Sequence, residues 1–305
     1  MPPAPPIELL SFRPGIPRAY RLAGVDLLTD IDLPVLQTYR IDGPAAWSAE
    51  REAPDDDGGE PVFDGRGLIV DGQRRVVCLV SDAGYRLEVD GIGAWWIAPD
   101  GRRIVETAVD PRCEPEIRAM AALGAPLVLA LALRGTFCIH ASAVIHGGKT
   151  AAFIGESGAG KSTLARYLDR EGGPDWRRLI DDTLPIAPPD PDAPATALPH
   201  FPQPKLPDAM QPSRLGPERL PLSAIYVLES DGDGIAIVPL RQSEATLALA
   251  AQTVGSRLFG RALLAGHIDF CVDLAARVPV KRLIYPREFA TLPAVQAALA
   301  ADLAD

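Results

Sequence analysis

The sequence is poor in the residues that mark zinc ribbons, disulfide-stapled domains and nucleic-acid-binding proteins. Its four cysteines, Cys78, Cys113, Cys138 and Cys271, lie far apart and form no Cys-x-x-Cys pair, which argues against a zinc ribbon and fits a reducing compartment. Lysine is scarce, with four residues, and thirty basic against forty acidic side chains leave a net charge of −10. Because phosphate-rich surfaces repel that charge, we expect no nucleic-acid partner and no anionic-membrane partner.

Long apolar runs are also missing. The longest uncharged apolar stretch, Ala119 to Leu133, has about 15 residues and contains Gly124 and Pro126, whereas a membrane-spanning helix needs about 20. We therefore expect a buried core helix at this place. The first residues lack the basic region and the apolar core of a signal peptide, so the sequence predicts a cytoplasmic protein.

The chain of 305 residues is long enough for two domains. From about Tyr20 to Val109, short β-like runs alternate with turns such as Asp82–Gly84 and Asp90-Gly91, which predicts a small antiparallel sheet. Further along the chain the pattern becomes α/β. We therefore expect a β-rich N-terminal domain over residues 1–110, with a structural or docking role, and an α/β domain over residues 111–305 that carries the chemistry.

A phosphate-binding motif lies in the second of these domains. The pattern GxxxxGK[ST] begins at Gly155 and ends at Ser162, after an apolar strand and before a helical run, which is the context that the motif requires. Its glycines let backbone amides point at phosphate oxygens, and the helix N-terminus adds partial positive charge. Lys161 supplies a charge for the β- and γ-phosphates, and the Ser162 hydroxyl can ligate Mg²⁺. The predicted nucleoside triphosphate site comprises Gly155, Glu156, Ser157, Gly158, Ala159, Gly160, Lys161, Ser162 and Thr163.

An acidic pair, Asp181 and Asp182, ends the strand that we expect next, residues 177–180. Asp181 lies twenty positions past Lys161, which leaves room for one helix, a turn and a returning strand. A right-handed crossover would lay that strand beside the phosphate-loop strand, with both carboxylates at its C-terminal edge and facing the phosphates. One carboxylate would ligate Mg²⁺, and the second could take a hydroxyl proton during phosphoryl transfer.

His140 lies in the apolar run 136–145, which pairs with residues 150–154 in a predicted β-hairpin. A lone histidine in such a run is commonly a hydrogen-bonded core residue, and Cys138-x-His140 without a second pair makes a poor zinc site. Because this strand pairs with the one that leads into Gly155, the imidazole could also orient an active-site carboxylate. Both interpretations stay open.

Three segments together resemble the catalytic core of HPr kinase/phosphorylase: Ile139–Val144, Gly155–Ser162 and Leu179–Asp182. That family shares its P-loop architecture with the ATP-dependent phosphoenolpyruvate carboxykinases. The resemblance is specific over residues 136–187, and residues 30–34 look more like the HPr-kinase-like proteins of ribosomal-peptide pathways, such as lasso-peptide kinases. It implies an α/β P-loop kinase core of this type, joined to the smaller N-terminal β-rich domain.

The resemblance also implies an activity: ATP and Mg²⁺ are used to phosphorylate a serine hydroxyl of a peptide or small protein. It makes Asp181 the proton acceptor, assisted by His140, places Lys161 on the phosphates, and makes Ser162 and Asp182 magnesium ligands. Lys205, in the segment Pro202-Gln203-Pro204-Lys205-Leu206, would lie near the phosphates or the acceptor. The family analogy further suggests a homo-oligomer.

Two other functions compete with a peptide kinase. Small-molecule hydroxyl kinases of the shikimate or gluconate type use a parallel sheet and an arginine-bearing lid, and the antiparallel hairpin expected before Gly155 argues against them. A nucleotide-sensing binding module would bind nucleotide without phosphoryl transfer, and Asp181→Asn would then leave its function intact.

Overall fold

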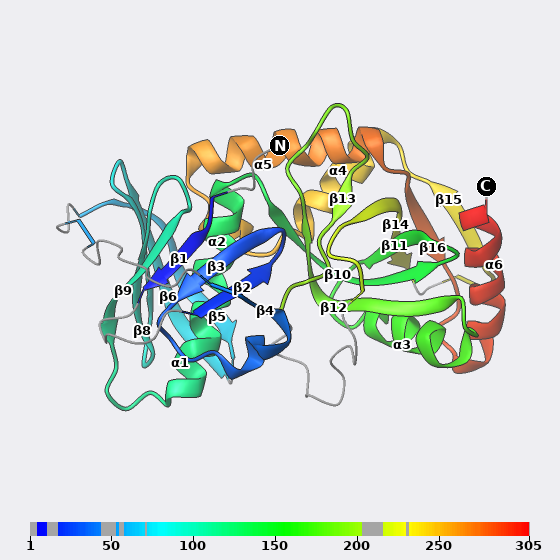
Figure 1. Cartoon of the computed structure of the whole chain (residues 1–305). Helices are drawn as coiled ribbons and strands as arrows, with labels where there is room; N and C mark the ends of the chain where they lie inside the picture. Colours follow the sequence, from blue (N-terminus) through cyan, green and yellow to red (C-terminus); the bar gives the residue numbers. More distant parts are fainter. Residues whose placement is uncertain are drawn as a thin grey trace. The chain divides into compact units, whose positions relative to one another are not determined.

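The computed structural model describes residues 5–10, 18–43, 53–54, 58–70, 72–202, 216–229 and 232–304 (Figure 1). The chain forms two compact units, of which the first comprises Met1–Thr136 and Gly255–Ala265 and the second Phe137–Val254 and Gly266–Asp305. The division therefore falls at Thr136 and not at residue 110, because two helices that follow the first sheet belong to the first unit. Both units combine helices with a β-sheet, so the fold is mixed α/β, as predicted.

In the described part of the first unit, nine strands form one sheet in the order β4-β2-β3-β1-β9-β8-β7-β6-β5. Their bounds are β1 (Ile7–Leu10), β2 (Arg18–Leu22), β3 (Val25–Thr29), β4 (Arg40–Ile41), β5 (Glu60–Ile69), β6 (Gly72–Ser81), β7 (Gly84–Val89), β8 (Gly93–Ile97) and β9 (Arg103–Val109), with a 3₁₀ turn η1 at Pro34–Tyr39. The sheet is antiparallel, as expected, except that β1 runs parallel to both of its neighbours, β3 and β9.

The turn predicted at Asp82–Gly84 is present in the structure between β6 and β7, and Gly84 explains why the chain turns there. Gly84 has φ +130°, a backbone conformation that residues with a side chain rarely adopt. A Cβ at this position would also collide with the carbonyl oxygen of Ile97, the last residue of the neighbouring strand β8. Glycine is therefore required at this turn for both backbone and steric reasons.

Two helices, α1 (Pro115–Ala122) and α2 (Ala125–Leu133), complete the first unit. Every α2 residue from Pro126 to Ala132 is buried, and the helix packs against β8 and β9. By length and composition the stretch 115–133 could cross a membrane, with a mean hydropathy of 1.7, but 61% of its apolar window is buried within the structure. This burial agrees with the core helix expected over residues 119–133, but the stretch forms two helices, since Leu123 caps the end of α1 and Gly124 the start of α2.

In the second unit, seven strands of the described residues form a sheet in the order β11-β10-β12-β13-β14-β16-β15, and β11 also pairs with β14. The bounds are β10 (Phe137–His146), β11 (Lys149–Ile154), β12 (Trp176–Ile186), β13 (Thr196–Ala197), β14 (Leu220–Glu229), β15 (Ala236–Pro239) and β16 (Val280–Ile284). Strands β11, β14 and β16 run parallel. The predicted hairpin is confirmed, since β10 pairs antiparallel with β11.

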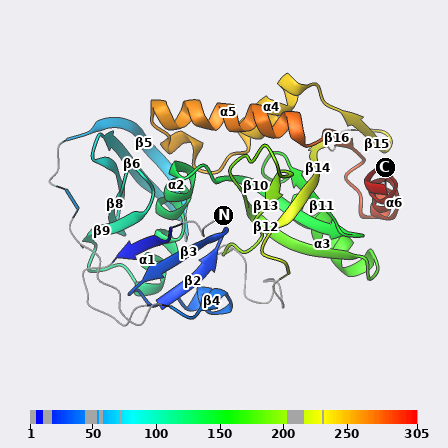
Figure 2. The ribbon, with the colours of Figure 1, turned by 45° about the horizontal axis from the view of Figure 1, so that its top comes forward.

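Helices lie on both sides of this second sheet, with α3 on one side and α4 on the other (Figure 2). Their bounds are α3 (Lys161–Glu171), α4 (Gln242–Ala251), α5 (Arg261–Arg277), which begins in the first unit, and α6 (Leu292–Ala304), with 3₁₀ turns η3 (Ser256–Leu258) and η4 (Phe289–Thr291). A core of apolar side chains joins α3 and α6 to the sheet, with Phe153, Leu164, Tyr226 and Leu299 fully buried in it. This core fixes α3, and with it the glycine loop, against the end of β11.

The crossover rule predicts that β12 lies beside β11. In the structure it does not, because β10 lies between the two strands. The tight turn between β10 and β11 makes them hairpin neighbours, and β12 pairs with the free side of β10. Strand β12 also continues to Ile186, so Asp181 and Asp182 lie inside it and not at its end. Asp181 pairs with Ser142, which in turn pairs with Phe153, so the acidic pair is nevertheless level with the end of β11.

Candidate functional site

A glycine loop, residues 155–160, connects the end of β11 to the start of α3. Strand, loop and helix therefore follow in the order that the motif predicts. Gly155, Gly158 and Gly160 have φ angles of +144°, +82° and +97°, which glycine adopts without strain. Because Gly160 is the N-cap of α3, the loop brings the positive end of that helix to the place where an anion would lie.

Lys161 turns its side chain back into the glycine loop. The residue is 6% exposed, and its Nζ donates to the carbonyl oxygens of Gly155, at 2.8 Å, and Glu156, at 3.1 Å. Burial lowers the pKa of Lys161, while the carboxylates of Asp182 and Asp181 act in the opposite direction. A buried ammonium group with neutral carbonyl partners gains further stabilisation from an incoming anion, as a phosphate would provide.

Asp181 is the more enclosed of the two aspartates, with 3% of its side chain exposed. Its Oδ1 accepts a hydrogen bond from the Ser142 hydroxyl at 2.6 Å, and its Oδ2 accepts one from Arg178 Nη1 at 3.1 Å. Both carboxylate oxygens therefore already have charged or polar partners within the protein.

A β-bulge explains how Arg178 reaches Asp181. The pairing of β10 with β12 shifts between Ala143 and Val144, which leaves Leu179 without an opposite residue. Residues three apart in a regular strand point to opposite faces, and one extra residue reverses that relation. The bulge thus places Arg178 and Asp181 on the same face. Neither Ser142 nor Arg178 had been identified from the sequence, since no motif marks a bulge.

Loss of the Arg178 guanidinium is expected to destabilise the second unit, because it leaves the Asp181 carboxylate buried without its cation. We expect Arg178→Gln to lower the free energy of unfolding in urea by about 3–5 kcal/mol. Arg177→Gln is the matched control, since Arg177 is exposed and surface changes cost about 0.5 kcal/mol or less. Equal losses in the two variants would show that the ion pair contributes nothing specific.

Asp182 is more accessible, with 18% of its side chain exposed. Its Oδ1 lies 3.6 Å from His140 Nε2, and its Oδ2 accepts a hydrogen bond from the Thr183 hydroxyl at 3.2 Å. His140, which was expected to assist Asp181, therefore lies beside the Asp182 carboxylate. In the strand register His140 pairs with Thr183, and Ala141 pairs with Asp182.

A cavity of about 770 Å³ lies between the glycine loop, the C-terminal ends of β14 and β16, and α4. Its polar lining residues include Glu156, Glu229, Gln252 and Arg287. The parallel strands β11, β14 and β16 all end at this edge, and ligands of α/β sheets bind in the crevice outside such strand ends. The volume is within the range of small-molecule sites.

Arg287 was not predicted, although it contacts the glycine loop directly. Its guanidinium donates to the carbonyl oxygen of Gly158, which lies 129 positions earlier in the chain. The residue follows β16 closely, and a position just after a parallel strand is the one signal that could have indicated it. Arg287 also lines a second cavity, of about 280 Å³, on the α3 side of the loop.

The remaining predicted residues are placed as follows. Ser162 lies in the first turn of α3, and Thr163 lines the smaller cavity. Within the described ranges, no group of three or more His, Cys, Asp and Glu side chains could hold a metal ion alone. Mg²⁺ commonly takes one or two protein oxygens and fills its shell with phosphate and water, so Ser162 and the acidic pair fit it. Lys205 lies outside the described residues, and its role stays a prediction.

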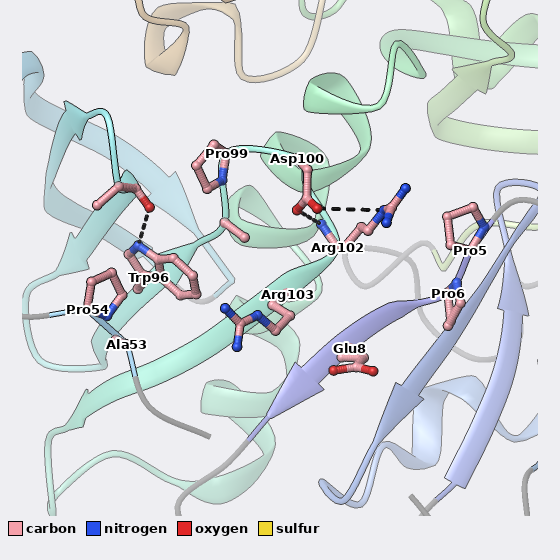
Figure 3. A pocket seen from close by; sticks show the side chains of 12 residues that line it. Pro5, Pro6, Glu8, Ala53, Pro54, Trp96, Pro99, Asp100, Arg102 and Arg103 are labelled. Carbon is pink, nitrogen blue, oxygen red and sulfur yellow. Dashed lines mark hydrogen bonds and ion pairs between the residues drawn. The ribbon is translucent and has the colours of Figure 1, made fainter. Parts of the chain in front are cut away.

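The first unit has a cavity of a different character, about 1280 Å³ in volume, with a rim that includes Pro5, Pro6, Pro54 and Pro99 (Figure 3). Within it, Trp96 Nε1 donates to the Ala83 carbonyl oxygen at 3.1 Å, and the Arg103 guanidinium lies 5.3 Å from the centre of the Trp96 ring. The charged residues of the lining include both signs. The groups that suit phosphate chemistry lie in the second unit.

Comparison with known proteins gives little further guidance. No protein-family model matches the chain, and no curated protein matches it. The solved structure of the Hpr(Ser) kinase/phosphatase from Coxiella burnetii matches with a TM-score of 0.29 and 10% identity, over 54% of this chain and 95% of that chain. A likeness at that TM-score carries no inference, so the function has to be inferred from the residues of the site.

Proposed function

We propose that the second unit is an ATP- and Mg²⁺-dependent kinase that transfers the γ-phosphoryl group to a serine hydroxyl of a peptide or small protein. The observation that carries this proposal is Lys161, held inside the glycine loop with two carboxylates close enough to affect its pKa. A module that only binds nucleotide needs the loop and the lysine. Phosphoryl transfer needs in addition a carboxylate that faces the phosphates and can accept a proton.

The reaction requires one proton acceptor, and the geometry favours Asp182 over Asp181. Both oxygens of Asp181 are engaged, one by the Ser142 hydroxyl and the other by Arg178 Nη1. Asp182 is partly accessible, with 18% of its side chain exposed, and it lies beside His140. We therefore assign the proton to Asp182, the orientation of that carboxylate to His140, and the anchoring of β12 to Asp181. Asp182 thus takes the role that the family resemblance gives to Asp181.

In the proposed step, the acceptor hydroxyl oxygen bonds to the γ-phosphorus while the bond from that phosphorus to the β–γ bridging oxygen breaks. ADP leaves, and the hydroxyl proton moves to the Asp182 carboxylate. Lys161 and the amides of the glycine loop hold the phosphate tail, and the Ser162 hydroxyl would be a protein ligand for Mg²⁺. When bound, Mg²⁺ neutralises charge that develops on the phosphate oxygens.

The proposal is tested with the full chain, Mg-ATP and a set of short peptides that each contain one serine. A transferred phosphoryl group adds roughly 80 Da and one doubly ionisable group to the peptide. The matched control is the same peptide with alanine in place of serine, which should show no mass increase. If the chain binds ATP but no serine peptide gains mass, the nucleotide-sensing alternative explains the site better than a kinase does.

A further inference from the structure

Among the described large hydrophobic side chains, Phe289 is the most exposed at 79%, ahead of Leu247 at 71%. It lies in the short turn η4, just before α6. Single exposed apolar residues are common on protein surfaces and need no explanation. Phe289 differs because it lines the cavity of about 280 Å³, whose apolar wall also includes Leu164, Tyr285 and Leu292.

This smaller cavity is continuous with the proposed phosphate site. Gly158, Gly160 and Thr163 line it, so it adjoins both the glycine loop and the first turn of α3. Tyr285 is close to the loop as well, since a Cβ placed on Gly160 would lie 3.3 Å from its hydroxyl oxygen. A group attached to a phosphate chain in the loop could therefore enter this cavity without crossing the acidic pair on β12.

The chemistry of the cavity suits a flat aromatic group at the end of a phosphate chain. Its wall is apolar, with an exposed phenyl ring, while Arg287 at its edge donates to the Gly158 carbonyl oxygen of the glycine loop. Burial raises the pKa of the Tyr285 hydroxyl, so that group remains neutral beside the ring system. A nucleobase has a π-face that stacks on aromatic side chains, whichever base it is.

We propose that this cavity binds the nucleobase of the triphosphate, stacked on the ring of Phe289, with Arg287 at the junction between base and phosphates. This inference rests on the proposed function, because it requires a nucleotide whose phosphates occupy the glycine loop. It adds a specific role for the C-terminal segment after β16.

The test compares two probes, Mg-ATP and magnesium tripolyphosphate, which has the phosphate chain but no base. Base stacking on an aromatic side chain contributes about 1–3 kcal/mol, so Phe289→Ala should weaken ATP binding by about 5- to 100-fold. Tripolyphosphate binding should stay unchanged, and Phe289→Trp should restore ATP affinity. Leu247→Ala is the matched control, because Leu247 is similarly exposed but is not among the residues that line this cavity.

Three results would overturn the inference, and calorimetry distinguishes them. If Phe289→Ala leaves ATP affinity unchanged, the base lies elsewhere. If Phe289→Ala lowers the affinities for ATP and for tripolyphosphate equally, Phe289 supports the loop and does not contact the base. If the unaltered chain binds neither probe, the proposed phosphate site itself is wrong. The first two results leave the proposed function standing.

Discussion

Asp182→Asn is expected to lower the rate of phosphoryl transfer by about 10²- to 10⁴-fold, which is the usual contribution of a general base. Asparagine retains the shape of the side chain and can still accept the hydrogen bond from Thr183, but it cannot accept the hydroxyl proton. The affinity for Mg-ATP should therefore change little. The measurement is single-turnover phosphorylation of the best serine peptide, with nucleotide affinity determined separately on the same variant.

Asp181→Asn is the comparison variant, because it shows which of the two aspartates accepts the proton. Since Asp181 pairs with Arg178 and Ser142, its loss should lower stability and reduce the rate less than Asp182→Asn does. The opposite pattern would contradict our assignment. If Asp181→Asn abolishes transfer in a folded protein, and Asp182→Asn only raises the Mg²⁺ requirement, then the roles implied by the family resemblance hold.

Lys161→Met is expected to remove the stabilisation that nucleotide confers. A ligand at one hundred times its Kd stabilises a protein by about 2.7 kcal/mol, which is measured as a rise in the melting temperature. We expect this rise to be lost in Lys161→Met, because the affinity for ATP falls by about 100-fold or more. Lys149→Met is the control: Lys149 lies in the β10–β11 hairpin, and its Nζ donates to the carbonyl oxygen of Ala304 at an exposed position. That variant should keep the full nucleotide response, and a response retained by Lys161→Met would exclude the proposed phosphate site.

Without nucleotide, the same two variants are expected to differ in how the stability of the chain depends on pH. Because burial lowers the pKa of Lys161, the folded chain binds fewer protons at this residue than the unfolded chain does between the lowered pKa and the ordinary value of 10.5. Stability should therefore rise with pH across that window, as linkage requires when the unfolded state binds more protons. Lys161→Met should remove this part of the slope, and Lys149→Met should retain it.

Local features of this protein were predictable from the sequence because their causes are local. The glycine loop, the hairpin around Gly147-Gly148 and the buried helix at 125–133 depend on residue types within a few positions of one another. The positive φ angles of Gly155 and Gly160 are the physical reason that the motif has glycine at these two positions. These features place a glycine loop at the end of a strand without any tertiary information.

The relations between distant segments were decided only by the tertiary structure. The crossover rule predicts the direction of β12 but not that β10 lies between it and β11. The pairing of β10 with β12 brings the Asp182 carboxylate beside His140, and one unpaired residue in β12 brings Arg178 to Asp181. Contacts such as that of Arg287 with Gly158 arise from packing between elements far apart in the chain. The amino-acid sequence by itself determined which groups could bind a phosphate, and strand pairing determined that Asp181 is buried against Ser142 and Arg178 while Asp182 stays partly accessible.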